Sequence, residues 1–185
     1  HIGEGPVNHR KQWEFVYILQ ALARAGMLAP GMRGLGFGVG EEPLASAFAA
    51  RGAEILATDL DTAEAANLGW VATDQHAAGK AALNQRGLCE LAGFEEKVEF
   101  RFLDMNAIPA ELPGQFDFCW SACAYEHLGN IELGLQFVIN SVACLRPGGV
   151  AVHTTELNCS SDDKTLAEGS TVLFRKRDFR DLDGL

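Results

Sequence analysis

The chain has 185 residues, which is enough for one globular domain with a full hydrophobic core, and its 48% hydrophobic content argues against a disordered protein. Its formal net charge of -10 argues against a nucleic-acid partner, because binding to phosphates needs a basic surface. No apolar run approaches the length of a membrane span and no signal-peptide pattern is present, so we expect a cytoplasmic protein with no membrane partner.

Five cysteines are scattered along the chain, at positions 89, 119, 123, 144 and 159. Their odd number and irregular spacing do not form a disulfide framework. Cys119 and Cys123 span an expected change from strand to loop, so the spacing of metal ligands on a helix does not apply to them. We therefore expect reduced thiols and no bound metal.

The first predicted element is a helix over residues 11–26, where apolar residues recur at helical spacing and Gly26 can end the helix. The predicted buried stripe consists of Phe15, Ile18, Leu19 and Leu22. Trp13 and Tyr17 lie off this stripe, so they either cap the core or close over a bound ligand.

A glycine-rich turn over residues 34–44 organises the rest of the chain. Its glycines accept positive φ and let a ligand approach the backbone. Pro43 suits the first turn of a helix, because its missing N–H group would have no partner there. The apolar residues Leu44, Ala47 and Phe48 then recur at helical spacing. The segment therefore predicts a strand, a turn and a helix over residues 43–51.

The second predicted strand, residues 54–58, is followed by Asp59. An acid at this strand tip can accept hydrogen bonds from both hydroxyls of a nucleotide ribose. The dinucleotide pattern G-x-G-x-x-G is not met, because its third glycine would fall at Glu41. Glu41 and Glu42 also place negative charge where a pyrophosphate would bind. A ligand that carries a carboxylate, an ammonium and a sulfonium suits this turn better.

Strands and helices alternate through the remainder of the chain. Residues 61–93 predict two or three short helices, and further strands are predicted at 98–103, 116–120 and 150–155. Asn130 is expected to cap a helix that the Pro-Gly-Gly turn at 147–149 ends. The apolar stripe of this helix is Ile131, Leu135, Val138, Ile139, Val142 and Leu145. The alternation predicts an α/β fold with a doubly wound, mostly parallel sheet and helices on both faces.

The last part of the chain turns polar after Glu156. It predicts a short strand or arm over 171–174 and the start of a helix over 175–185. We expect a single domain over residues 1–185, with its core at 31–157 and an incomplete C-terminal segment at 158–185.

Over roughly residues 30–157, these motifs resemble those of the class I S-adenosylmethionine (SAM)-dependent methyltransferases. The glycine turn resembles the first motif of the family, Asp59 its ribose-binding acid, and Asp104-Met105 the pair that contacts adenine. Residues 116–121 are similar to the fourth strand, Glu126-His127-Leu128 to the loop after it, and 145–149 to the turn into the fifth strand. Two features depart from the family: Gly34 stands where an acid is usual, and the last two, antiparallel strands are not in this sequence.

The resemblance implies a Rossmann-like enzyme that binds SAM and methylates a small molecule. The implied cofactor-binding residues are Gly36, Phe37, Gly38, Gly40, Asp59, Leu60, Asp104, Met105 and Ser121. His127 and Glu156 are the expected catalytic residues, as candidates for a base, while His153 lies mid-strand and is expected to be packed. The contact that an acid at position 34 would make is absent or supplied from elsewhere.

The acceptor pocket is expected among Trp13, Tyr17, Trp70, His76 and the polar tract after Glu156. This mixed aromatic and polar lining suits O-methylation of a small hydroxylated metabolite or sugar, and a homodimer is possible. A second hypothesis is an oxidoreductase of Rossmann type that binds NAD(P) or a nucleotide sugar. It would need the third glycine and a Tyr/Lys or His/acid catalytic pair, and Tyr125 has Gly129 rather than a lysine four residues later. A third is a non-catalytic, SAM-binding-like interaction module.

Overall fold

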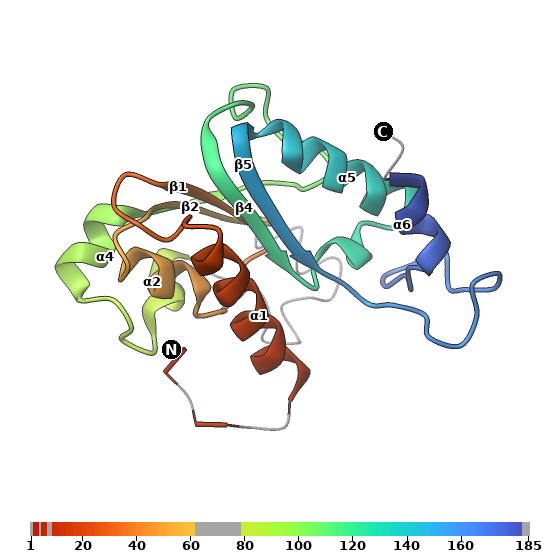
Figure 1. The fold of residues 1–185 in the computed structure, drawn as a ribbon, viewed down its shortest axis with the longest axis horizontal. Helices are drawn as coiled ribbons and strands as arrows, with labels where there is room; N and C mark the ends of the chain where they lie inside the picture. The colour runs from red at the N-terminus through yellow and green to blue at the C-terminus, as the bar shows by residue number, and fades with distance from the viewer. Residues whose placement is uncertain (1, 4, 7–8, 62–78, 183–185) are drawn as a thin grey trace.

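The computed structural model describes residues 2–3, 5–6, 9–61 and 79–182. Its centre is a sheet of five parallel strands in the order β3-β2-β1-β4-β5 (Figure 1). The strands are β1 (Arg33–Phe37), β2 (Glu54–Asp59), β3 (Val98–Phe102), β4 (Phe116–Ala122) and β5 (Leu145–Thr154). The chain reverses its direction of travel across the sheet after β3, so the predicted doubly wound, parallel architecture is confirmed.

Helices cover both faces of the sheet (Figure 1). One face carries α1 (Arg10–Arg24), α2 (Leu44–Ala49) and α4 (Leu91–Lys97), and the other carries α5 (Ile131–Ala143) and α6 (Lys176–Leu182). Two short 3-10 helices, η2 (Lys80–Asn84) and η3 (Tyr125–His127), lie in the connections. None of the helices in the described ranges is both long and apolar enough to cross a bilayer.

The core on the α1 face depends on aromatic residues of β4. The Trp120 and Phe118 rings each meet Phe48 of α2 edge-on, at centroid distances of 5.0 and 5.7 Å. A Cβ at Gly34 would lie 2.3 Å from the Phe118 ring, and one at Gly36 would lie 2.4 Å from Trp120. These glycines of β1 are therefore required by packing across the sheet. The predicted apolar stripe of α1 is confirmed, because all four of its residues are buried.

Helix α5 begins as predicted, and its predicted stripe is confirmed in part, because Ile131 is buried and Leu135, Val138 and Leu145 pack against the core. The Asn130 side chain accepts a hydrogen bond from the Leu133 N–H at 2.8 Å, which confirms the predicted N-cap. The buried residues are Ile131, Gly134, Phe137 and Ser141. Ile139 and Val142, which the sequence placed on the buried stripe, are 37% and 50% exposed. The apolar pattern was misleading because a glycine that admits the Phe174 ring and a hydrogen-bonded serine occupy the inner face.

Strand β5 starts five residues before its predicted start at residue 150 and contains the Pro-Gly-Gly turn. Phe116 pairs with Leu145 and Phe118 with Val150, so the extra residues form an irregularity in the strand. Gly148 has φ +87, which glycine adopts easily. Arg146 pairs with Asp117 of β4 at 3.0 Å and so holds this part of the strand to its neighbour. A turn signal in sequence thus marks a bulge here.

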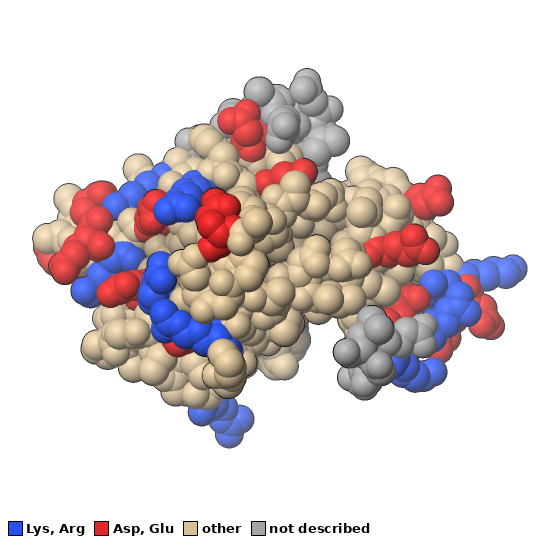
Figure 2. Space-filling view, turned by 90° about the horizontal axis from the view of Figure 1, so that it is seen from above, with Lys and Arg blue, Asp and Glu red and all other residues tan. Residues whose placement is uncertain are grey.

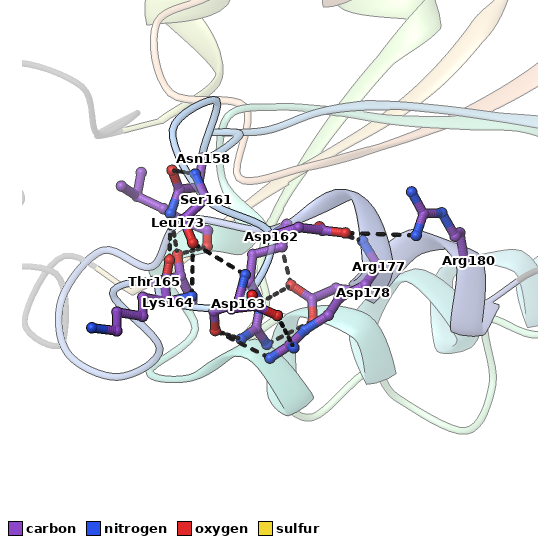
Figure 3. Close-up of polar contacts among 11 residues, drawn as sticks. Asn158, Ser161, Asp162, Asp163, Lys164, Thr165, Leu173, Arg177, Asp178 and Arg180 are labelled. Atoms are coloured by element: carbon purple, nitrogen blue, oxygen red, sulfur yellow. Dashed lines mark hydrogen bonds and ion pairs between the residues drawn. The ribbon is translucent and has the colours of Figure 1, made fainter.

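The segment after β5 packs on the end of the α5 face. Val172 and Phe174 are fully buried, and Phe174 forms an isolated parallel bridge with Leu157, which matches the predicted arm. Polar contacts within the segment hold its two ends together: Asp162 and Asp163 form hydrogen bonds and ion pairs with arginines just before and within α6 (Figure 3). The predicted C-terminal helix is confirmed as α6. No further strand follows β5 in the part of this segment that the structure describes.

Candidate functional site

The glycine turn connects β1 to α2 at the carboxyl edge of the sheet, where parallel α/β sheets bind ligands. Gly38 and Gly40 have φ values of +56 and +50, a conformation that side chains rarely adopt. A Cβ at Gly38 would also lie 2.8 Å from the Ala124 Cβ and 3.2 Å from the Met105 sulfur. The turn therefore requires glycine at both positions, and it lies against the segments that follow β3 and β4.

Asp59 fastens the glycine turn to the tip of β2. Its Oδ2 accepts a hydrogen bond from the Gly40 N–H at 3.0 Å, and its Oδ1 accepts one from the Leu60 N–H at 2.8 Å. The Leu103 N–H, next to Asp104, donates to the Asp59 carbonyl at 2.7 Å. Asp59 therefore fixes the glycine turn and the start of the segment after β2 at the carboxyl edge of the sheet.

The predicted cofactor residues divide into two groups. Gly38, Gly40, Asp59, Leu60, Asp104 and Met105 lie around the turn. Gly36, Phe37 and Ser121 lie beneath it. The Phe37 ring packs edge-on against Phe137 at 5.1 Å, and the Ser121 hydroxyl, fully buried, binds His153 Nδ1 at 2.8 Å. The side chains of the second group therefore support the turn from the core.

His153 is a packed residue, as its mid-strand position indicated. Its two ring nitrogens bind the hydroxyls of Ser121 and Ser141 at 2.8 and 3.0 Å. Burial lowers the pKa of His153 from 6.5 to about 4, so its ring is neutral at pH 7. It joins β4 and β5 to α5 and is not placed to receive a proton from a substrate.

A second group of polar residues follows β4 and β5. His127 Nδ1 lies 2.8 Å from the Ser170 carbonyl and 3.1 Å from the Thr171 hydroxyl. Because a carbonyl only accepts, Nδ1 carries the hydrogen, and Nε2 of the neutral ring can accept a proton. Burial lowers the pKa of His127, which favours this neutral form. Glu156, after β5, forms an ion pair with Arg10 of α1.

The fully buried Glu126 lies between the two strands, where its Oε2 accepts a hydrogen bond from Thr155 at 3.0 Å. The N-terminus of α1 covers this region: Lys11 donates to the Ala122 carbonyl at 2.8 Å, and Glu14 is buried nearby. Sequence reasoning named His127 and Glu156 but not the residues of α1, because more than a hundred residues separate the N-terminus of α1 from the ends of β4 and β5.

Comparison with solved structures shows which fold this is. The magnesium protoporphyrin IX methyltransferase ChlM from Synechocystis PCC 6803 matches 98% of this chain and 78% of its own, with a TM-score of 0.63 and 13% identity. The glycopeptide N-methyltransferase MtfA matches 83% of this chain and 58% of its own, with a TM-score of 0.55 and 18% identity. The chain has the fold of the class I SAM-dependent methyltransferases.

A third methyltransferase, phosphoethanolamine N-methyltransferase 1 from Haemonchus contortus, matches 87% of this chain and 28% of its own, with a TM-score of 0.57 and 13% identity. The chain spans about half the length of several of the methyltransferases that it matches. Neither a protein-family model nor a curated protein sequence matches it.

Glu42 is a buried acid just before α2, at the end of the glycine turn. Phe118 fills the space beside Gly34, so no side chain fits there. Glu42 is buried at the start of α2, and its Oε1 accepts a hydrogen bond from Trp120 Nε1 at 2.5 Å. Burial raises the pKa of Glu42 from 4.5 to about 8, and the charges of Asp59 and Glu14 act in the same direction. The sequence showed Glu42 only as a charge that repels phosphate.

The predicted acceptor residues are only partly described. Trp13 and Tyr17 stack on each other at 5.3 Å, but they are 64% and 50% exposed, so they do not cap the core. Trp70 and His76 lie outside the described residues.

On the face in Figure 2, acidic and basic side chains are interspersed, and its described part shows no broad basic stripe.

Proposed function

We propose that this chain binds SAM at the glycine turn and transfers a methyl group to an oxygen of a small hydroxylated metabolite or sugar. One observation carries the proposal: the Asp59 carboxylate lies at the tip of β2 and accepts hydrogen bonds from the Gly40 and Leu60 N–H groups, which places an acid beside the glycine turn, where sheets of this kind bind a ribose. The SAM-bound MtfA and SAH-bound ChlM structures, which share the fold, support this assignment.

The residues around the turn fit the chemistry of SAM. Asp59 is placed to bind the ribose, and Asp104 and Met105 are placed on the adenine side. The backbone of Gly38 and Gly40 allows close approach of the ligand. Glu42 is a buried acid at the end of the turn, where Trp120 hydrogen-bonds it. SAM supplies a methyl group on a sulfonium leaving group, so this chain has mainly to align the acceptor with it.

His127 is assigned the role of base for the acceptor hydroxyl. The Ser170 carbonyl fixes the hydrogen on Nδ1, so Nε2 can take the proton. Glu156, which pairs with Arg10 after β5, is the second proposed catalytic residue and the other candidate for the base. The substrate is a small molecule in this proposal. A cytoplasmic location and a homodimer stay predictions.

Calorimetric titration with S-adenosylhomocysteine (SAH) tests the cofactor assignment, with NADH as the comparison ligand. We expect micromolar SAH binding and no NADH binding. Asp59→Asn should weaken SAH binding at least about 10-fold, because it loses a charged acceptor. Asp162→Asn, in the C-terminal network, is the matched control and should bind as the wild type does. Binding of NADH alone would favour the oxidoreductase hypothesis. SAH binding without methyl transfer to any acceptor would favour the hypothesis of a non-catalytic interaction module.

A further inference from the structure

Three potential metal ligands converge where β4 and β5 end. Cys123 and Glu126 follow β4, Glu156 follows β5, and one donor atom from each lies within 4.8 Å of the others. Cys123 has φ +49, a left-handed backbone that residues other than glycine rarely adopt. The parallel sheet thus brings together a thiol and two carboxylates that lie up to 33 positions apart in the sequence.

One of these ligands is a buried carboxylate with an unsatisfied oxygen. Glu126 is fully buried, and its Oε1 has no hydrogen-bond partner. His127 Nε2 lies 4.0 Å from Oε1, beyond hydrogen-bond distance, and belongs to a ring that burial keeps neutral. Glu14 Oε2, on the α1 side, is the other buried side-chain polar atom without a hydrogen bond in the described residues. Buried polar atoms are normally satisfied, so an unsatisfied carboxylate oxygen beside two further donors indicates a cationic ligand.

The Arg10 guanidinium lies at the edge of this cluster. Its Nη1 pairs with Glu156 and lies 3.6 Å from the Cys123 sulfur and 3.7 Å from Glu14 Oε1. The Arg10 side chain is 53% exposed, so it can turn into solvent without unpacking the core. The cluster therefore already attracts one cation, yet Glu126 Oε1 has no hydrogen-bond partner.

We propose that Cys123, Glu126 and Glu156 bind a divalent zinc-like cation in exchange for the Arg10 guanidinium. A thiolate with two carboxylates suits Zn²⁺, whereas Mg²⁺ and Ca²⁺ prefer oxygen ligands alone. In a tetrahedral site the donor atoms lie about 3.5 Å apart, so the cluster must contract by about 1 Å. Glu156 is partly exposed at the end of β5 and can move inward.

Metal binding to this cluster releases a proton and displaces a guanidinium group. The Cys123 thiol releases its proton to solvent as the sulfur–metal bond forms, and Arg10 leaves Glu156. Three protein ligands leave a coordination position for water or for an oxygen of the acceptor. That last consequence rests on the proposed function, whereas metal binding itself does not. The sequence indicated no metal because spacing along the chain did not show Glu156 beside Cys123.

Titration of the purified, metal-free chain with Co²⁺ tests the site, because cobalt bound to a thiolate gives a near-ultraviolet charge-transfer band. We expect the wild type to show the band and Zn²⁺ to displace it. Cys123→Ser should abolish the band, and Cys159→Ser, which alters an exposed cysteine, should keep it. The isosteric Glu126→Gln should weaken binding at least about 10-fold, and Arg10→Gln should tighten it.

Absence of the band from the folded wild type would overturn the proposal, and so would equal loss of the band in the two serine variants. Circular dichroism of each variant separates loss of metal from loss of fold. SAH calorimetry on the same preparation keeps the two proposals apart. A cobalt band without SAH binding would support the metal site and refute the proposed methyltransferase function. SAH binding without the band would refute the metal site and leave the proposed function standing.

Discussion

Single residues near the glycine turn have properties that depend on neighbours far along the chain. Glu42 is acidic in sequence, but it is buried against Trp120 and carries a pKa raised to about 8. The folded protein therefore holds its proton at pH 7, whereas the unfolded chain, with the ordinary value of 4.5, loses it. Its contribution to stability is full below pH 4.5 and is lost as the pH rises to about 8.

The first prediction concerns this proton. Glu42→Gln mimics the protonated acid and keeps an acceptor for Trp120, so it should remove this pH dependence. Between pH 5 and pH 8 the free energy of unfolding of the wild type should fall, relative to the variant, by about 1.4 kcal/mol for each unit of pH. Urea unfolding at both pH values measures the difference. Glu41→Gln, at the exposed neighbouring position, is the control and should follow the wild type. Parallel curves for wild type and Glu42→Gln would contradict the assignment.

At the scale of elements, the strands were the most predictable part of the fold. The apolar runs and the alternating pattern between turn residues located β2, β3 and β4 within about two residues. The inner face of α5 and the start of β5 were not predictable. They depend on Phe174 meeting Gly134 and on Arg146 pairing with Asp117, and both contacts join residues far apart in sequence.

The candidate site divides in the same way. The glycine turn and Asp59 lie on consecutive elements, so their spacing in sequence predicted their proximity. The Arg10–Glu156 pair and the burial of Glu126 could not be predicted, because they depend on how α1 docks over β4 and β5.

The packing of β1 against β4 gives an element-scale prediction. In Gly36→Ala the new methyl group would lie 2.4 Å from Trp120 and 2.6 Å from Val39, so it should lower the free energy of unfolding by about 1–3 kcal/mol. Gly93→Ala in α4 is the matched control, since its nearest contact is 3.8 Å and alanine favours helix by about 1 kcal/mol. Urea midpoints followed by tryptophan fluorescence compare the two. Equal stability of both variants would contradict the prediction and show that β1 can shift to make room for the added methyl group.

At the scale of the whole molecule, the proposed function assigns two tasks to two parts of the sheet edge. The loops after β1, β2 and β3 form the turn site, whereas the segments after β4 and β5, covered by α1, form the second group of polar residues. The two groups adjoin, because Ala124 lies against Gly38. A cofactor on one side and an acceptor on the other would then meet at this boundary, and substitutions in one group should affect one task.

His127 gives the test of this separation. His127→Gln should leave the SAH dissociation constant unchanged, because His127 contacts Ser170 and Thr171 in the C-terminal segment and not the glycine turn. Its rate of SAH formation, measured with a hydroxylated acceptor that the wild type methylates, should fall about 10²- to 10⁴-fold, the usual contribution of a positioned base. Loss of SAH binding would mean that His127 holds the fold of the whole edge. Full activity would assign the proton to another group, and the segments after β4 and β5 would then only bind the acceptor.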